Sequence, residues 1–228
     1  MKGLDQAITL HLPNRIEIGA GAAAKLGEWA SGYGRVLIIA QPVTSEMAPK
    51  LELGGDVAIF EGVAPEPKDR DLAAALDAAR FHKPDLIVGL GGGSVMDVAK
   101  LVAVLWNSDK ELENVAGPNR VAGKCSDLAQ VATTAGTGSE GGIRALVTLS
   151  ESNAKMAVES PFMSADIAIL DPELTMTVPS AVTAATGVDA LAHCVEAFTN
   201  INAHPLIDGY ARMGMQLVGK YLRRAVED

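Results

Sequence analysis

The stretch DLIVGLGGGSVMDVAKLVAVLWN, residues 85–107, decides the fold class of this chain. It opens with an apolar run suited to a strand buried on both faces and closes with apolar residues at helical spacing. Between them stand Gly91, Gly92 and Gly93, whose lack of a Cβ atom allows another group to approach the backbone closely. The segment therefore predicts a strand, a glycine turn and a helix in succession, with Ser94 and Asp97 as a capping-box-like pair.

Similar apolar runs recur on both sides of this segment. VLIIA at 36–40, VAIF at 57–60 and IAIL at 167–170 are each followed by polar residues, glycine or proline. A helix is predicted over 70–82, where leucine and alanine recur at helical spacing after Asp69, a candidate N-cap. Strands that alternate with helices predict an α/β fold built on a parallel, helix-covered sheet.

The two ends of the chain follow different patterns. In ITLHLPNRIEIG, residues 8–19, apolar and polar residues alternate. This pattern predicts a hairpin at the edge of the sheet with one face exposed to solvent. From about Pro179 onward the pattern is typical of two helices broken near 200–205. We therefore expect an α/β domain over 1–178 and the start of an all-helical domain over 179–228.

Composition excludes several classes of protein. The chain has 228 residues, 48% hydrophobic and 21% charged, and its 28 acidic and 19 basic residues give a formal net charge of −9. It is too apolar to be disordered and too acidic for a nucleic-acid partner. Since nothing in it resembles a signal peptide or a membrane span, we expect a cytoplasmic protein that has no membrane partner. Cys125 and Cys194 predict neither a disulfide framework nor a CxxC site.

Two other glycine clusters compete with residues 91–93 for a phosphate-binding role. GAGAAA at 19–24 matches a dinucleotide-binding pattern, but Arg15 and Glu17 in the strand before it do not suit a central strand. GTGSEG at 136–141 matches GxGxxG but is followed by no convincing helix. We therefore favour the turn at 91–93, because the free N–H groups of a helix N-terminus attract a phosphate.

Four segments together resemble the successive signatures of the iron-containing (group III) alcohol dehydrogenases. They are GGGSVMDVAK at 91–100, TTAGTGSE at 133–140, LDPELT at 170–175 and TGVDALAHCVEAF at 186–198. The resemblance implies a dehydroquinate synthase-like fold, in which a dinucleotide-binding domain is followed by an all-helical domain. It also implies an oxidoreductase that transfers a hydride between NAD or NADP and a small alcohol, aldehyde or ketone.

The same resemblance implies which residues hold the cofactor. The pyrophosphate would lie on the glycine turn, and threonines of a second loop would line the cofactor channel. Lys155 and Leu174 match positions that contact the ribose and adenine side of the cofactor in the family. A solvated lysine and a core leucine are equally good interpretations of these two residues. The full implied set is Gln41, Gly91, Gly92, Gly93, Ser94, Asp97, Thr133, Thr134, Thr137, Lys155 and Leu174.

Gln41 stands where many members of that family have an aspartate that contacts the adenosine ribose. A carboxylate at that position would repel a 2′-phosphate, whereas a neutral amide would not. We therefore predict that NADP is accepted alongside NAD or in its place.

Asp189 and His193 match the family's first two metal ligands and are the candidate catalytic and metal-binding residues, for Fe²⁺ or Zn²⁺. Four residues apart on a helix, they share one face, although most such pairs are surface hydrogen bonds. The family's two further histidine ligands would lie beyond the last residue of this chain. His11, His82 and His204 offer no obvious substitute, so we expect an incomplete metal site.

The chain is therefore expected to be a fragment or a shortened homologue whose helix pair exposes apolar residues. Such a surface predicts self-association, as a homodimer or a higher oligomer. Two alternatives stay open: a metal-independent reductase or polyol dehydrogenase on the same scaffold, similar to the maleylacetate reductases, and a non-catalytic nucleotide-binding remnant. The apolar residues expected at the surface are Val195, Phe198, Met213, Leu217 and Leu222.

Overall fold

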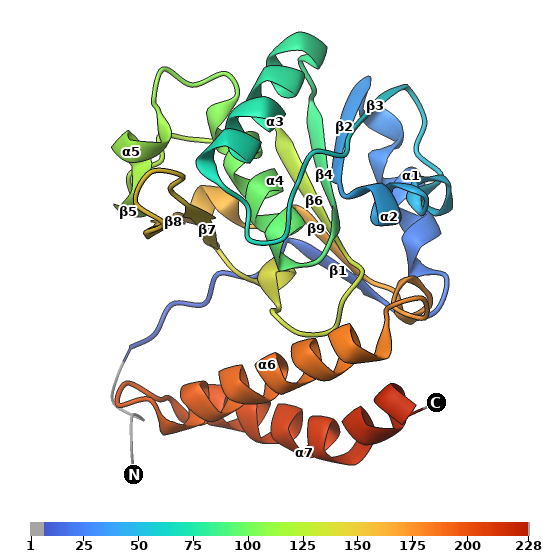
Figure 1. The fold of residues 1–228 in the computed structure, drawn as a ribbon, viewed down its shortest axis with the longest axis vertical. Coiled ribbons are helices and arrows are strands. Elements are labelled where there is room, and N and C mark those ends of the chain that lie inside the picture. The colour runs from blue at the N-terminus through green and yellow to red at the C-terminus, as the bar shows by residue number, and fades with distance from the viewer. Residues whose placement is uncertain (1–6, 228) are drawn as a thin grey trace. The chain divides into compact units, whose positions relative to one another are not determined.

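The computed structural model describes residues 7–227 (Figure 1). Their contacts divide them into two compact units. The α/β unit comprises His11–Thr133 and Ser139–Leu174, and the helical unit contains Thr134–Gly138, the residues from Thr175 onward and residues 7–10. The expected domain boundary at 178/179 stays a prediction.

The α/β unit is built on a six-stranded sheet in which every strand pairs parallel to its neighbours, with the order β1-β9-β6-β4-β2-β3. β4 lies between β6 and β2 and is buried along its whole length, as its apolar run predicts. The parallel-sheet α/β fold is confirmed. The strands are β1 (Arg15–Ile18), β2 (Arg35–Ala40), β3 (Asp56–Phe60), β4 (Leu86–Gly91), β6 (Asp127–Ala132) and β9 (Ile167–Leu170).

Helices cover both faces of this sheet, because successive side chains of a strand point to opposite sides (Figure 1). Leu37 and Ile39 pack in one core with α3 and α4, whereas Val36 and Ile38 pack with Leu26 of α1 in a second core. The helices of the unit are α1 (Lys25–Trp29), α2 (Pro42–Ser45), α3 (Asp69–His82), α4 (Gly93–Leu105) and α5 (Leu112–Val115).

A second, three-stranded sheet packs against α4 in the same unit. Its order is β5-β8-β7, from β5 (Gly117–Pro118), β7 (Arg144–Thr148) and β8 (Lys155–Glu159). These strands and β6 were not predicted. Gln130 interrupts the apolar run of β6; its side chain is fully buried and donates from Nε2 to the Met96 carbonyl at 3.0 Å.

The predicted edge hairpin at 8–19 is wrong, although its strand does lie at the edge of the sheet. β1 pairs parallel with β9, and residues 8–12 form no strand. The backbone N–H of Asn14 donates to the Ala165 carbonyl, and its side-chain amide donates to Asp166. Asp166 lies 152 residues after Asn14, and such contacts with a distant segment set the direction of β1, which alternation alone does not specify.

The helical unit contains the two helices that the sequence predicts, α6 (Ser180–Thr199) and α7 (Pro205–Glu227), which pack side by side (Figure 1). Small residues allow this close packing: a Cβ on Gly214 would lie 2.5 Å from the Cys194 sulfur, and one on Gly187 would collide with Leu222. Among residues 7–227, no helix combines the length and the apolar character needed to cross a membrane.

Candidate nucleotide-binding site

The glycine turn joins the carboxyl end of the central strand to the start of a buried helix. Gly92 is the N-cap of α4, and its carbonyl accepts hydrogen bonds from Val95 and Met96, both at 3.1 Å. Within the described residues no side chain caps this helix, so the predicted capping box of Ser94 and Asp97 is wrong. The first N–H groups of the helix are therefore available to an acceptor from outside it.

The glycines around this turn serve different purposes. A Cβ on Gly91 would lie 2.7 Å from Val95 Cβ, and one on Gly89 would collide with Gln130, so both are explained by close packing. Gly92 has φ −83° and ψ −172°, an extended conformation open to any residue. Its backbone angles therefore do not call for glycine, and a residue without a Cβ at this position allows a ligand to approach the backbone closely.

The competing turn at 19–24 is already occupied by a carboxylate of the protein. Asp171 accepts a hydrogen bond from the Ala23 N–H at 3.0 Å through one oxygen and from the Glu173 N–H, also at 3.0 Å, through the other. Gly21, with φ +76°, is explained by its left-handed backbone. A phosphate at this turn would meet like charge.

The cluster at 136–141 also lacks the geometry of a dinucleotide-binding turn. It ends in a 3₁₀ turn, η4 (Ser139–Gly141), and, as predicted, no α-helix follows directly, since the next element is β7.

The predicted N-cap role of Asp69 is wrong. Helix α3 begins at that residue, and the N–H of Lys68, the residue before it, donates to Asp71 at 2.9 Å. Asp69 instead accepts from the backbone N–H and the hydroxyl of Ser150, a partner that no local pattern indicates.

Asp97 lies at the centre of a partly buried polar network that was not predicted. Its carboxylate accepts from the Ser139 hydroxyl at 2.6 Å and from the Leu146 N–H at 2.9 Å. The Lys100 ammonium lies 3.8 Å from the same carboxylate and donates to Ser139 Oγ at 2.8 Å and to the Arg144 carbonyl at 2.9 Å. In the sequence, the one sign of this network is a lysine, Lys100, within the apolar run of α4.

Burial sets the titration of this network. It raises the pKa of the Asp97 carboxyl, against which the Lys100 charge acts, and it lowers the pKa of Lys100, against which the Asp97 charge acts. Burial also raises the pKa of Glu140, the next residue after Ser139. The cofactor role predicted for Asp97 stays a prediction, because the contacts of both its oxygens are with the protein.

The second predicted loop is anchored at its start beside the glycine turn. Thr133 is buried, and its N–H donates to the Gly91 carbonyl at 3.1 Å. Thr134 and Thr137 belong to the helical unit, and their cofactor role stays a prediction.

The three remaining candidates lie in the α/β unit. Gln41 follows β2, and its side-chain amide donates to the Val63 carbonyl at 3.1 Å. Leu174 is fully buried in a core, which supports the interpretation as a core leucine. Lys155 lies 3.8 Å from the Glu66 carboxylate, and both side chains are largely exposed. Their cofactor contacts stay predictions.

Asp189 and His193 lie on α6, with His193 Nε2 at 3.6 Å from Asp189 Oδ2, and both side chains are about half exposed. Their donor types suit Fe²⁺ or Zn²⁺. In the part of the chain that the structure describes, no group of three or more His, Cys, Asp or Glu residues is placed to hold a metal ion. Two donors are fewer than a stable site uses, so the described residues by themselves do not fit a metal ion.

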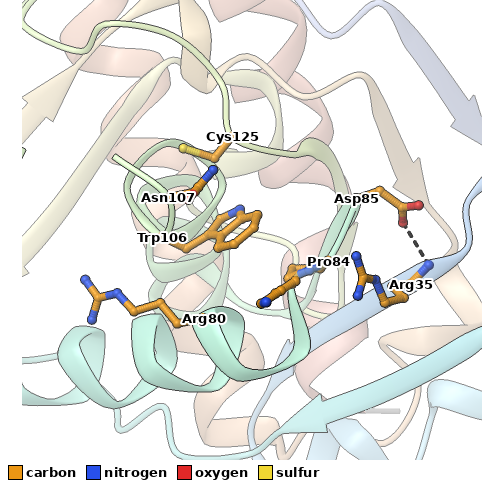
Figure 2. A pocket seen from close by; sticks show the side chains of 8 residues that line it. Arg35, Arg80, Pro84, Asp85, Trp106, Asn107 and Cys125 are labelled. Carbon is orange, nitrogen blue, oxygen red and sulfur yellow. Dashed lines mark hydrogen bonds between the residues drawn. The ribbon is translucent and has the colours of Figure 1, made fainter. Parts of the chain in front are cut away.

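A surface hollow of about 560 Å³ lies at the opposite end of the sheet, where β2 and β4 begin (Figure 2). Its one carboxylate, Asp85, accepts from the backbone N–H groups of Gly34 and Arg35 at 2.8 and 2.9 Å. Ligands of open parallel sheets bind at the carboxyl ends of the strands, so we do not expect the cofactor in this hollow. It is lined by Arg35, Arg80, Lys83, Pro84, Asp85, Trp106, Asn107 and Cys125.

Comparison with known protein families agrees with the four motifs. The family model of the iron-containing alcohol dehydrogenases matches residues 13–172, and the model of the C-terminal part of the same family matches residues 183–228. The chain belongs to the iron-containing alcohol dehydrogenase family. The resemblance seen in the sequence is thereby confirmed.

Individual relatives of this family cover nearly all of the chain. It is 37% identical over 226 residues to long-chain-alcohol dehydrogenase 1 of Geobacillus thermodenitrificans (strain NG80-2), with 94% of this chain and 57% of the relative covered. It is 34% identical over 224 residues to the NAD-dependent methanol dehydrogenase of Bacillus methanolicus, with 94% and 59% covered. The chain thus spans less than two thirds of the length of these two relatives.

Solved structures show the same fold. A 1,3-propanediol oxidoreductase matches with a TM-score of 0.93 at 32% identity, covering 97% of this chain and 60% of that one. Sulfoacetaldehyde reductase from Bifidobacterium kashiwanohense, solved in complex with NAD⁺, matches with a TM-score of 0.91 at 29% identity, covering 99% and 62%. The iron-type alcohol dehydrogenase fold predicted from the motifs is confirmed.

Proposed function

We propose that this chain is the nucleotide-binding part of a dehydrogenase that transfers a hydride between NAD and a small alcohol. In the oxidative direction the alcohol carbon gives a hydride to C4 of the nicotinamide and the hydroxyl loses its proton, which yields an aldehyde or ketone and NADH. The names of the relatives, which include alcohol and methanol dehydrogenases, support this reaction class.

The observation that carries the proposal is the uncapped N-terminus of α4 after Gly92. The helix start offers its N–H groups and its positive dipole end to the pyrophosphate, with no side chain on Gly92 to hinder its approach. It follows the central strand at the carboxyl edge of the sheet, where open parallel sheets bind nucleotides. This chain's own part in the reaction is to hold and orient the cofactor.

The proposal extends to cofactor choice and metal. Gln41 places a neutral amide after β2, so NADP is accepted as well as NAD. Asp189 and His193 supply two ligands to Fe²⁺, or to Zn²⁺ in its place, and the protein acts in the cytoplasm as a homo-oligomer. The Glu61 carboxylate accepts a hydrogen bond from Ser45, whose own N–H donates to the Gln41 carbonyl at 2.9 Å, and Glu61 becomes the residue to test if NADP is excluded.

Substitution of Gly92 by serine tests the site. Serine is a favourable N-cap, so Gly92→Ser leaves thermal stability unchanged or raised, but its side chain occupies the pyrophosphate position and weakens NADH binding by about tenfold or more. Titrations followed by nicotinamide fluorescence measure the Kd values of NADH and NADPH for both proteins.

Gly54→Ser is the matched control, because a Cβ on Gly54 meets no atom within 4 Å, and it should bind NADH like the wild type. A crystal soaked with NAD⁺ that shows the cofactor at residues 19–24 would refute the assignment. Wild-type protein that binds neither cofactor would refute the function itself.

A further inference from the structure

The hollow where β2 and β4 begin contains two cations that no other group of the described residues engages (Figure 2). Neither the Arg35 guanidinium nor the Lys83 ammonium forms a hydrogen bond or an ion pair with residues 7–227. The third cation of the lining, Arg80, is paired with Asp77 at 2.9 Å. Arg35 and Lys83 are therefore available to an anion from solution.

The carboxylates in and beside this hollow are engaged by other donors. Asp85 accepts from the backbone N–H groups of Gly34 and Arg35 at 2.8 and 2.9 Å. Asp127, whose N–H donates to the Asp85 carbonyl, accepts from the Tyr33 hydroxyl at 2.6 Å. The lining thus has three positive side chains against one negative, in a chain whose formal net charge is −9. This local excess of positive charge predicts an anionic ligand.

Trp106 gives the same hollow a planar apolar surface. Its indole N–H donates to the Ser126 hydroxyl, which in turn donates to the Pro84 carbonyl, both at 2.7 Å. These bonds fix the ring and occupy its only polar group, so a ligand in the hollow meets the carbon surface of the ring. Asn107, the next residue, adds an exposed amide that can both donate and accept.

These groups match the parts of a nucleotide. Arginine and lysine bind a phosphate, an aromatic ring stacks on a base, and an amide hydrogen-bonds to the edge of a base. The volume of the hollow, about 560 Å³, lies within the roughly 300–1,000 Å³ of small-molecule sites. We propose that this hollow binds a nucleoside monophosphate, with its phosphate at Arg35 and Lys83 and its base on Trp106.

This site is separate from the turn to which the cofactor is assigned. Both lie in the α/β unit, but the hollow is where β4 begins, whereas the turn is where β4 ends. At about 3.3 Å per residue, the six residues of β4 separate them by on the order of 17–20 Å. The inference therefore goes beyond the proposed function and does not depend on it.

Adenosine monophosphate (AMP) is the probe, and Trp106 is the reporter. The sequence has two tryptophans, so Trp29→Phe leaves Trp106 as the only one. In this background AMP should quench the tryptophan fluorescence in a saturable manner. Calorimetric titration of the unsubstituted 228-residue chain should give the same Kd. Absence of saturable AMP binding in both measurements would overturn the proposal.

Two substitutions of exposed residues remove the charges without disturbing the core. Arg35→Gln should weaken AMP binding by about tenfold or more, the effect of losing hydrogen bonds to a charged group. Lys83→Gln should weaken it less, because Lys83 follows the C-terminal end of α3, whose partial negative charge it offsets. Lys50→Gln is the matched control, since Lys50 is exposed and lies outside the hollow, and its Kd should stay within about twofold of wild type.

Further ligands test the two parts of the site. Inorganic phosphate lacks the base and adenosine lacks the phosphate, so each should bind at least about tenfold more weakly than AMP. If either binds as tightly as AMP, the nucleotide assignment is overturned. AMP binding that is unchanged in both Arg35→Gln and Lys83→Gln would overturn it as well.

Gly92→Ser separates this inference from the proposed function. AMP should bind to this variant within about twofold of wild type, because the hollow is remote from the turn. A loss as large as in Arg35→Gln would place AMP at the cofactor turn and overturn the proposal. Wild-type protein that binds AMP in the hollow but does not bind NADH would refute the proposed function and support this inference.

Discussion

Single residues at the amino ends of the strands show how the protein uses charge for stability. The Tyr33 hydroxyl donates to Asp127 at 2.6 Å, and Asp85 accepts two backbone N–H groups at the start of β2. Burial, followed by the hydrogen bond to Asp127, raises the pKa of Tyr33 well above its usual range. The folded protein therefore holds the Tyr33 proton at a pH where the unfolded chain releases it.

Tyr33→Phe tests this link between a proton and stability. A group whose pKa is raised on folding stabilises the protein below its unfolded pKa, about 10 for tyrosine, and this contribution is lost as the pH rises further. The wild type should therefore lose more stability than Tyr33→Phe between pH 9 and 11, on the order of 1 kcal/mol for one partly exposed hydrogen bond. Urea unfolding across that range measures it, and parallel pH profiles for the two proteins would contradict the prediction.

At the scale of elements, similar glycine patterns have different partners. The turn at 19–24 follows an edge strand and is closed by Asp171, whereas the turn at 91–93 follows the central strand and has no side-chain cap. Each glycine pattern is local, but the carboxylate that closes the first turn lies 148 residues away from it. This difference explains why only one of the two turns suits a phosphate.

Asp171→Ala tests the structural role of the first turn. The variant leaves the Ala23 N–H buried without its acceptor, so we expect a loss of about 1–3 kcal/mol in unfolding free energy. NADH affinity should stay within about twofold of wild type, because the cofactor is assigned to the other turn. A variant with unchanged stability but much weaker NADH binding would contradict both assignments.

At the scale of the whole molecule, the helical unit leaves much of its apolar surface uncovered. Val195, Met213 and Leu217 are exposed, as predicted, with Met213 at 52% and Leu217 at 49%. Phe198 and Leu222 are only partly exposed, and Leu222 packs over Gly187. An apolar surface of this kind favours association.

We therefore expect this 228-residue chain to self-associate. Sedimentation velocity should show species that grow with protein concentration, and the double substitution Met213→Gln and Leu217→Gln should reduce them because it makes α7 more polar. As a control, Phe81→Gln changes an apolar residue that is 92% exposed on α3, and it should leave association unchanged. A monomer at all concentrations would contradict the prediction.

The sequence by itself determined the α/β core, the glycine turn before α4 and the helix pair, because each depends on a local pattern. A parallel strand buried on both faces is a continuous apolar run, and a helix repeats its apolar residues every three to four positions. The family motifs added the fold and the candidate site residues. None of these features depends on which distant segment lies beside them.

Only the tertiary structure decided which strands pair with one another and which donors the carboxylates accept from. β1 pairs parallel with β9 because Asn14 meets residues 165 and 166, and the partners of Asp97 and Asp69 are Ser139 and Ser150, which replace the predicted caps. An alternating strand can pair in either direction, and a carboxylate can accept from any nearby donor. Strand direction and hydrogen-bond partner depend on which distant segments the sheet and its helices bring together, and a local sequence pattern does not predict this.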